Sequence, residues 1–143
     1  MICPDVNVLI YAHREDAPEH GAYATWLRDL VHHPQPFALS ELVLSAVIRI
    51  VTNRRAFSEP TSLSLAVGFV EGLRARRNAR VVRPGERHWS TFVELCNASK
   101  ASGKLVADAY HAAIAIEHGL TWATADSDFA RFPLLNWRHP LRP

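Results

Sequence analysis

Residues Lys104–Phe129, KLVADAYHAAIAIEHGLTWATADSDF, carry the clearest structural pattern in the chain. Its first half carries apolar residues at helical spacing, so one stripe of a helix faces a core. Gly119 stands where that helix would end, because glycine readily adopts the backbone conformation that closes a helix. Leu120 to Ala125 is short and apolar, which is typical of a buried strand. The stretch therefore predicts a helix, a tight turn, a strand and then a loop.

Three acidic side chains flank this helix–strand unit. Asp108 lies beside the apolar stripe near the start of the helix, and Asp126 and Asp128 follow the strand. A carboxylate placed next to a core loses favourable hydration and needs a compensating partner. Three acids around one such unit suggest a bound cation.

Short apolar segments alternate with amphipathic helices along the rest of the chain. Helical stripes run from residue 23 to 31, 43 to 51, 63 to 73 and 89 to 96, and strand candidates occupy residues 1–5, 37–39, 79–82 and 134–137. This alternation predicts an α/β fold with a mostly parallel sheet. The 143 residues fit one domain, and the sequence contains no linker, internal repeat or low-complexity segment.

Composition narrows the class of protein. The chain is 48% hydrophobic and 21% charged, which is typical of a globular protein rather than a disordered one. Cys3 and Cys96 are isolated, so they form neither a disulfide framework nor a zinc pattern, and a reduced cytoplasm is the expected compartment. The N-terminal stretch is unlike a signal peptide. The sequence contains no run of about 18 uncharged apolar residues, which is the length that would span a membrane.

The basic residues are almost all arginines, since Lys100 and Lys104 are the only lysines among 16 basic side chains. Five of these arginines fall between Arg74 and Arg83. Arginine binds phosphate through two parallel hydrogen bonds, so this run is either a phosphate-binding edge or an ordinary solvated face. Codon bias in a GC-rich genome explains the excess of arginine equally well.

Four acidic residues are expected to meet at one edge of the sheet. Asp5, Glu41 and Asp126 each follow a predicted strand, and Asp108 opens a helix nearby. In open parallel sheets the functional crevice lies outside the carboxyl ends of the strands. Taken singly, Asp5 is explained as a helix cap and Glu41 as a first-turn acid favoured by the helix dipole. Together the four predict a common site.

A site of four carboxylates has a definite chemistry. Like charges repel, so at least one carboxyl would have a raised pKa unless a cation neutralised the group. Oxygen ligands select Mg²⁺ or Mn²⁺ over zinc. Such an ion activates water and stabilises a leaving oxygen, which suits phosphodiester hydrolysis.

The ordered set of motifs resembles the PIN-domain ribonucleases, specifically VapC-type toxins of type II toxin–antitoxin pairs. The similarity covers nearly the whole chain, although no single motif is specific. The matching pieces are Asp5–Ala12 (DVNVLIYA), Ser40–Leu42 (SEL), Asp108–Ala109 (DA), Thr124–Phe129 (TADSDF) and Asn136–Leu141 (NWRHPL).

The resemblance implies a single PIN domain over residues 1–143, a three-layer fold with a mostly parallel five-stranded sheet flanked by helices. It implies Mg²⁺-dependent cleavage of single-stranded RNA, with Mn²⁺ as a substitute ion, a homodimer, and a VapB-type antitoxin that blocks the groove. Asp5 and Asp108 are the principal metal ligands by this resemblance, and Glu41 and Asp126 complete the catalytic group. The accessory residues are Asn7, Thr124 and Asp128, and His111 is given no catalytic role.

Two rival interpretations remain. A phosphotransfer enzyme with Asp5 as nucleophile would need a second aspartate two residues later, where this chain has Asn7. A catalytically inactive PIN-fold module that binds RNA or protein is the main alternative, although none of the four acids is missing. An antitoxin helix would need an exposed apolar groove, which is expected around Trp26, Leu30, Leu63 and Val67.

Overall fold

The computed structural model describes residues 1–142, and only Pro143 of the expected domain lies outside this range. The elements in chain order are β1 (Ile2–Pro4), α1 (Val6–His13), α2 (His20–His32), β2 (Phe37–Ser40), α3 (Glu41–Val51), α4 (Leu63–Arg74), β3 (Ala79–Val82), α5 (His88–Ser99), α6 (Lys104–Glu117), β4 (Thr121–Ala123), the 3-10 helix η1 (Ser127–Arg131) and β5 (Trp137–Arg138). Strands and helices alternate, so the predicted α/β fold is confirmed.

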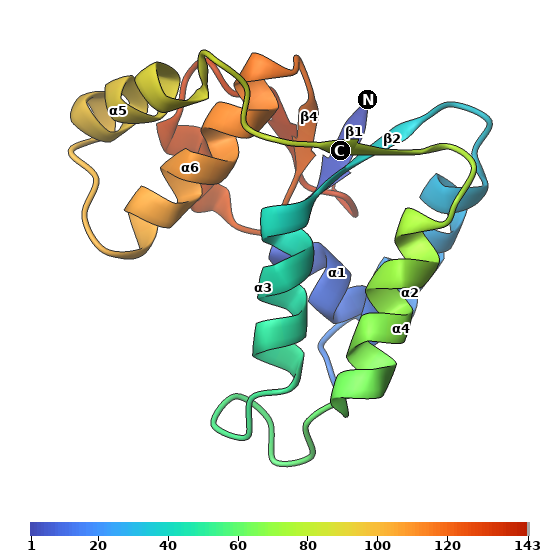
Figure 1. Cartoon of the computed structure of the whole chain (residues 1–143). Helices are drawn as coiled ribbons and strands as arrows, with labels where there is room; N and C mark the ends of the chain where they lie inside the picture. Colours follow the sequence, from blue (N-terminus) through green and yellow to red (C-terminus); the bar gives the residue numbers. More distant parts are fainter. Residues whose placement is uncertain (143) are drawn as a thin grey trace.

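Every strand pair in the described part of the chain is parallel. Hydrogen bonds join β1, β4 and β5 into one sheet in the order β1-β4-β5, and join β2 to β3 in a second. β1 lies beside β2 in space, so the five strands form one layer (Figure 1). The expected five-stranded sheet is continuous in space, but its ladder of hydrogen bonds is interrupted between β1 and β2. One reason is that β1 has three residues and its Pro4 has no backbone N–H to donate.

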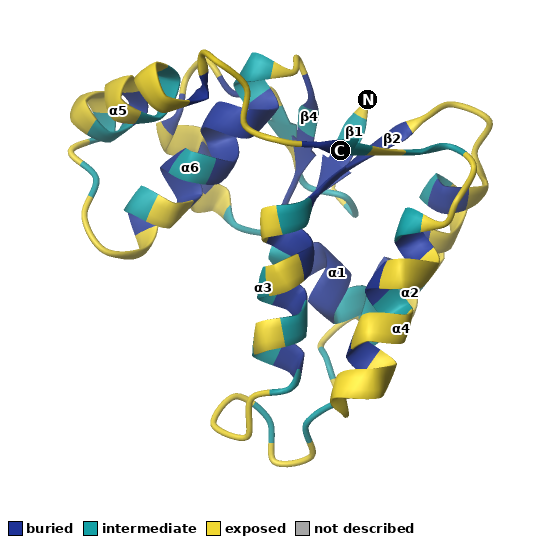
Figure 2. Cartoon of the chain, in the orientation of Figure 1, coloured by how far each residue is buried: buried dark blue, intermediate teal, exposed yellow. Residues whose placement is uncertain are grey.

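Helices cover both faces of this layer. Figure 1 shows α5 and α6 on one side and α1 to α4 on the other, which is the three-layer arrangement expected from the sequence. Buried residues concentrate in the strands and on the inward faces of α1, α3 and α6 (Figure 2). Trp122 on β4 is fully buried and packs against Phe129, with 5.7 Å between ring centroids.

Residues 104–129 form the helix, turn, strand and loop that their sequence predicts. α6 ends next to Gly119, whose φ of 61° is the left-handed conformation that glycine adopts most easily. β4 follows directly and is central in its sheet. None of the helices in residues 1–142 combines the length and apolar character that a membrane crossing requires.

The register of β1 and β4 positions the site. Pro4 pairs with Ala123, so the two strands end side by side at their carboxyl ends. The Asp5 amide donates to the Ala123 carbonyl across 2.8 Å, which extends the pairing by one residue. Asp5 and Thr124 are therefore the first residues beyond adjacent strand ends.

Candidate active site

Asp5 is held rigidly at the junction of β1 and α1. It caps α1, and its Oδ1 accepts a 2.6 Å hydrogen bond from the Val6 amide. Its Oδ2 accepts from Thr124 Oγ1 at 2.6 Å and from Asn7 Nδ2 at 2.9 Å. The residue is only 4% exposed. Its carboxylate is therefore fixed by three donors, one of which comes from the far end of the chain.

Asn7 and Thr124 connect the two halves of the site. Asn7 Nδ2 also donates to Thr124 Oγ1 at 3.1 Å, and Asn7 Oδ1 accepts from the Ala125 amide at 3.1 Å. Thr124 Oγ1 accepts in turn from the Asp126 amide at 3.0 Å. This network ties the start of α1 to the loop after β4, which is the structural basis for treating both residues as accessory.

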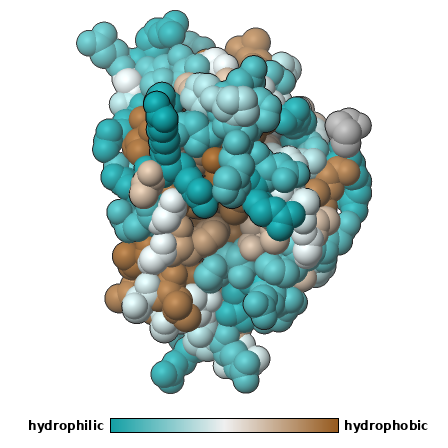
Figure 3. All heavy atoms as spheres, turned by 90° about the vertical axis from the view of Figure 1, so that its right-hand side faces the viewer, coloured by the Kyte–Doolittle hydropathy of each residue, from teal (hydrophilic) through white to brown (hydrophobic). Residues whose placement is uncertain are grey.

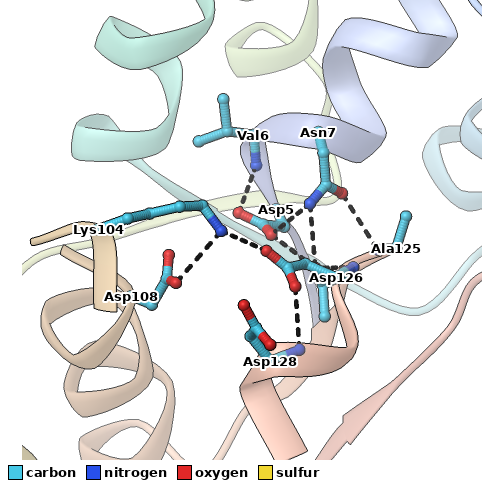
Figure 4. A network of polar contacts seen from close by, with 9 residues as sticks. Asp5, Val6, Asn7, Lys104, Asp108, Ala125, Asp126 and Asp128 are labelled. Carbon is cyan, nitrogen blue, oxygen red and sulfur yellow. Dashed lines mark hydrogen bonds and ion pairs between the residues drawn. The ribbon is translucent and has the colours of Figure 1, made fainter. Parts of the chain in front are cut away.

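Asp108 and Asp126 share one lysine. Lys104 Nζ lies 3.4 Å from Asp108 Oδ2, one helical turn along α6, and contacts Asp126 Oδ2 more closely (Figure 4). Asp126 Oδ1 accepts from the Asp128 amide at 2.9 Å. Asp128 itself is exposed, so in this structure its contribution is to hold the loop through its backbone.

These groups line one cleft of about 280 Å³, which we call the acidic cleft. Its walls come from α1, α3, α6 and the loop after β4. The lining includes Asp5, Asn7, Asp108, Asp126, Lys104, His111, Ala46 and Arg49. Lys104 and Arg49 were not predicted as site residues. The spacing of four between Lys104 and Asp108 on one helix was a readable signal, whereas nothing local to Arg49 pointed to the cleft.

The charges of the acidic cleft are incompletely compensated. Burial raises the pKa of Asp5 to about 6, and the nearby charges of Asp108 and Asp126 add to this despite the hydrogen bonds from Thr124 and Val6. Burial also raises the pKa of Asp108, against the attraction of Lys104. Burial alone would raise the pKa of Asp126 too. The hydrogen bonds from Lys104 and the Asp128 amide, together with the positive charge of Lys104, outweigh burial and hold the Asp126 pKa below its usual value.

The donor set of the acidic cleft fits a hard divalent cation. Its anionic groups are the carboxylates of Asp5, Asp108 and Asp126, whose oxygens Mg²⁺ and Mn²⁺ prefer. With Lys104 between Asp108 and Asp126, no three His, Cys, Asp or Glu side chains of residues 1–142 are arranged to hold one ion among themselves. Mg²⁺ usually needs only one or two carboxylates, because waters and substrate phosphates supply the remaining ligands.

The structure does not bring Glu41 into the acidic cleft, which corrects the expected group of four acids. Glu41 opens α3, and its carboxylate lies 3.1 Å from Arg74 Nη1 on α4 and 2.5 Å from Arg83 Nη2 after β3. Hydrogen bonds from Arg83 and Arg74 hold the pKa of Glu41 below its usual value. At the first helical position its side chain meets these two arginines, while Ala46 and Arg49 of the same helix face the cleft.

Comparison with known proteins places this geometry in a family. The model of the PIN domain matches residues 2–135. The chain belongs to the PIN-domain family. Within this family the chain is 50% identical over 141 residues to ribonuclease VapC43 of Mycobacterium tuberculosis, covering 99% of this chain and 96% of the relative. Ribonuclease VapC25 of the same organism is 40% identical over 132 residues, 92% of this chain and 93% of VapC25.

Solved structures share the PIN fold at low sequence identity. The VapBC2 structure from Rickettsia felis, bound to a promoter DNA fragment, aligns with a TM-score of 0.71 at 19% identity over 97% of this chain and 98% of that one. VapBC-1 from Haemophilus influenzae aligns with the same TM-score at 17% identity, covering 99% of this chain and all of that chain. These likenesses support the three-layer architecture of this PIN domain.

His111 forms part of the wall of the PIN-domain cleft. It is 9% exposed, stacks near Trp122 with 5.5 Å between ring centroids, and its Nδ1 has no hydrogen-bond partner among residues 1–142. Burial lowers its pKa to about 4, so the ring is neutral at physiological pH. The neutral ring therefore forms an uncharged part of the cleft wall.

Proposed function

We propose that this PIN domain is the toxin of a VapBC-type toxin–antitoxin pair and acts in the cytoplasm as a metal-dependent endoribonuclease on single-stranded RNA. The observation that supports this most is the acidic cleft, where Asp5, Asp108 and Asp126 from distant segments line one cavity. The ribonuclease VapC relatives at 40–50% identity support the reaction class.

Each residue of the acidic cleft has a proposed task. Asp5 and Asp108 would hold Mg²⁺ or Mn²⁺, and Asp126 would complete the site directly or through water. The bound ion would lower the pKa of a water and stabilise the leaving oxygen of the phosphodiester. Asn7 and Thr124 keep the Asp5 carboxylate oriented through their hydrogen bonds, which limits reorganisation during the reaction.

The two cations of the cleft suit an anionic substrate. Arg49 from α3 and Lys104 from α6 line the same cavity as the aspartates, and Lys104 is 68% exposed in its side chain. In this structure the Lys104 ammonium neutralises Asp108 and Asp126. With a metal ion bound, the ammonium would be free to turn toward an RNA phosphate, since its long side chain is flexible and largely solvated.

A second cavity supports an antitoxin partner. A hollow of about 370 Å³ lies between α2 and α4. It is lined mostly by apolar residues and by Gly68 and Gly72, with Arg28, His32 and Arg76 as its basic members. Leu63 and Val67 nearby are 63% and 39% exposed, whereas Trp26 and Leu30 are half-buried. Figure 3 shows apolar side chains gathered low on the face that α2 and α4 present. An amphipathic antitoxin helix fits such a groove.

The groove offers a test that leaves the fold intact. A Cβ added at Gly68 or Gly72 would meet no atom within 4 Å, so both positions accept a side chain. Gly68→Leu and Gly72→Leu should therefore fill the groove, retain RNA cleavage and weaken binding of the product of the neighbouring gene. Tight binding by both variants would contradict this docking site.

A homodimer is part of the same proposal. On α5, Trp89 is 67% exposed and Val93 38% exposed, and Phe92 lies next to Trp89 with 5.4 Å between ring centroids. An exposed aromatic patch of this kind is typical of a protein interface. Sedimentation of the wild type should show a dimer and Trp89→Glu should shift it to a monomer. A monomeric wild type would contradict the proposal.

The deciding experiment is brief induction in cells, followed by sequencing of RNA ends. The wild type should arrest growth and produce new RNA ends, and Asp5→Asn should do neither at equal expression. The inactive-module alternative predicts no new ends with either protein, and that outcome would refute the ribonuclease proposal.

A further inference from the structure

The arginine run between Arg74 and Arg83 is divided by the fold. Its two outer members pair with Glu41. Arg76, Arg77 and Arg80 are exposed and form no salt bridge with any acid in the described part of the chain. The structure therefore leaves three guanidinium groups uncompensated within five residues of sequence.

These three arginines line a common cavity, which we call the arginine pocket. It measures about 550 Å³, and its other walls are the end of α2 and the loop that leads into β2. The remaining lining residues are Val31, His32, His33, Pro34, Pro36 and Asn78. This volume falls within the range of small-ligand sites and accommodates one nucleotide.

The arginine pocket is held in shape by its own hydrogen bonds. Asn78 Nδ2 donates to the His33 carbonyl at 2.8 Å and to the Gln35 carbonyl at 3.2 Å, which fixes the loop before β2. Arg80 Nη1 donates to the Arg77 and Ala79 carbonyls at 3.1 and 2.9 Å. One nitrogen of Arg80 is thus anchored, while the rest of its guanidinium remains available.

The arginine pocket lies at the amino ends of the strands, and the acidic cleft lies at their carboxyl ends. Arg80 is at the start of β3, and the Phe37 amide at the start of β2 bonds to the Asn78 carbonyl. Asp5 and Asp126 follow the carboxyl ends of β1 and β4. The two ends of the four-residue strands β2 and β3 are about 13 Å apart, so a single phosphodiester cannot occupy both sites.

We propose that the arginine pocket is an exosite that binds the phosphodiester backbone of single-stranded RNA outside the acidic cleft. Guanidinium groups bind phosphate oxygens through paired hydrogen bonds. The His32 and His33 rings at the same cavity give a base a surface on which to stack. These rings and a cavity of nucleotide size favour RNA over an acidic peptide, which needs only the charge. The exosite rests on the proposed ribonuclease function, because it presents the substrate of that reaction.

The binding test compares two triple variants with equal change in charge. Arg76→Gln/Arg77→Gln/Arg80→Gln removes the exosite, and Arg54→Gln/Arg55→Gln/Arg87→Gln is the control, since these arginines are exposed, lie outside both sites and form no salt bridge in residues 1–142. Fluorescence anisotropy with labelled single-stranded RNA of about 20 nucleotides in EDTA measures affinity without cleavage.

The exosite variant should bind this RNA about tenfold or more weakly than the wild type, and the control should stay within about twofold. The slope of log affinity against log salt should become shallower by about 2, because three phosphate contacts are lost at about 0.7 each. If both variants lost the same RNA affinity, net charge alone would explain the effect, and the proposal would be overturned. So would an exosite variant that keeps RNA affinity but loses binding of a polyglutamate peptide or changes its oligomeric state.

Cleavage separates the exosite from the function on which it rests. With Mg²⁺, kcat/KM of the exosite variant should fall for the long RNA and remain at the wild-type value for a dinucleotide, whose single phosphodiester cannot occupy both sites. Equal loss on both substrates would overturn the exosite. A wild type that binds RNA through the three arginines but cleaves neither substrate would refute the ribonuclease proposal and leave the binding site supported.

Discussion

Asp5 and Glu41 each stand directly after a strand, yet the fold gives them opposite surroundings. Asp5 is 4% exposed, has three hydrogen-bond donors and forms no salt bridge within residues 1–142, and its pKa is raised to about 6. Glu41 is half-exposed, touches Arg74 and Arg83, and has a lowered pKa. The position after a strand brings an acid to the right edge of the sheet, but the cations nearby decide what the acid does.

The surroundings of Asp5 suit a binding site, whereas those of Glu41 suit an ion pair that links helices. A buried carboxylate without a cation is unfavourable, so the Asp5 carboxylate beside two other aspartates is the arrangement expected of the proposed cation site. Glu41 already has its positive charges and links α3 to α4 and to the end of β3. Exposed ion pairs of this kind contribute little to stability.

The largest expected effect is a difference in RNA cleavage between Asp108→Asn, in the acidic cleft, and Glu41→Gln, outside it. Asp108→Asn keeps the side-chain shape and removes one negative charge from the proposed metal site, so cleavage of single-stranded RNA should fall by about 100-fold or more. Glu41→Gln should remain within about fivefold of the wild type, because its carboxylate is outside the acidic cleft. The measurement is kcat/KM with Mg²⁺, and equal losses in the two variants would break the comparison.

The raised pKa of Asp5 predicts how stability depends on pH when metal is absent. Between pH 3.8 and about 6 the folded protein keeps a proton on Asp5 that the unfolded chain has released, so folding is increasingly disfavoured as pH rises through this window. The cost is about 3 kcal/mol at most. His111, with its lowered pKa, acts in the opposite direction, because the unfolded chain protonates first as pH falls.

The two contributions are separated by a difference measurement. In EDTA, the unfolding free energy of the wild type minus that of Asp5→Asn should decrease between about pH 4 and about pH 6.5, since His111 titrates equally in both proteins and cancels. A difference that does not change with pH would show that the Asp5 carboxyl has its ordinary pKa.

Mg²⁺ should stabilise the folded protein by a smaller amount. A ligand that binds only the folded state at ten times its Kd adds about 1.4 kcal/mol, which corresponds to a rise in Tm of a few degrees. The wild type and Glu41→Gln should both show this rise with Mg²⁺ or Mn²⁺, and Asp5→Asn should not. A wild-type Tm that is indifferent to both ions would argue against a metal site.

The smallest expected effect concerns the ion pairs of Glu41 with Arg74 and Arg83. Glu41→Gln should lower Tm slightly, and high salt should reduce the difference because the ion pairs are exposed and screened. Adding Arg83→Gln should cost less in the Glu41→Gln background than in the wild type, since the two side chains interact directly. Independent, additive effects would show that the pair contributes nothing.

The helices, the parallel sheet and three of the four predicted site acids follow from patterns in the sequence. Apolar periodicity predicted the helices, and the alternation with short strands predicted the parallel sheet. Asp5, Asp108 and Asp126 were predicted to share a site because strand ends and the start of a helix meet at one edge. The sequence was sufficient for residues whose place follows from the regular geometry of a helix or a parallel sheet.

The remainder depends on contacts between distant segments. Arg74 and Arg83 lie 33 and 42 residues from Glu41, so no local pattern indicated that they would remove it from the cleft. The contact of Lys104 with Asp126 spans 22 residues and is equally invisible in sequence. The division of the arginine run into paired and unpaired members likewise required the packed structure.

Calorimetric titration with Mn²⁺ shows whether the aspartates of the acidic cleft, and not Glu41, hold the proposed cation. The wild type and Glu41→Gln should bind Mn²⁺ with the same affinity, while Asp108→Asn should bind it about tenfold or more weakly because a ligand charge is lost. If Glu41→Gln weakens Mn²⁺ binding as much as Asp108→Asn does, or if the wild type binds no Mn²⁺, the claim is contradicted.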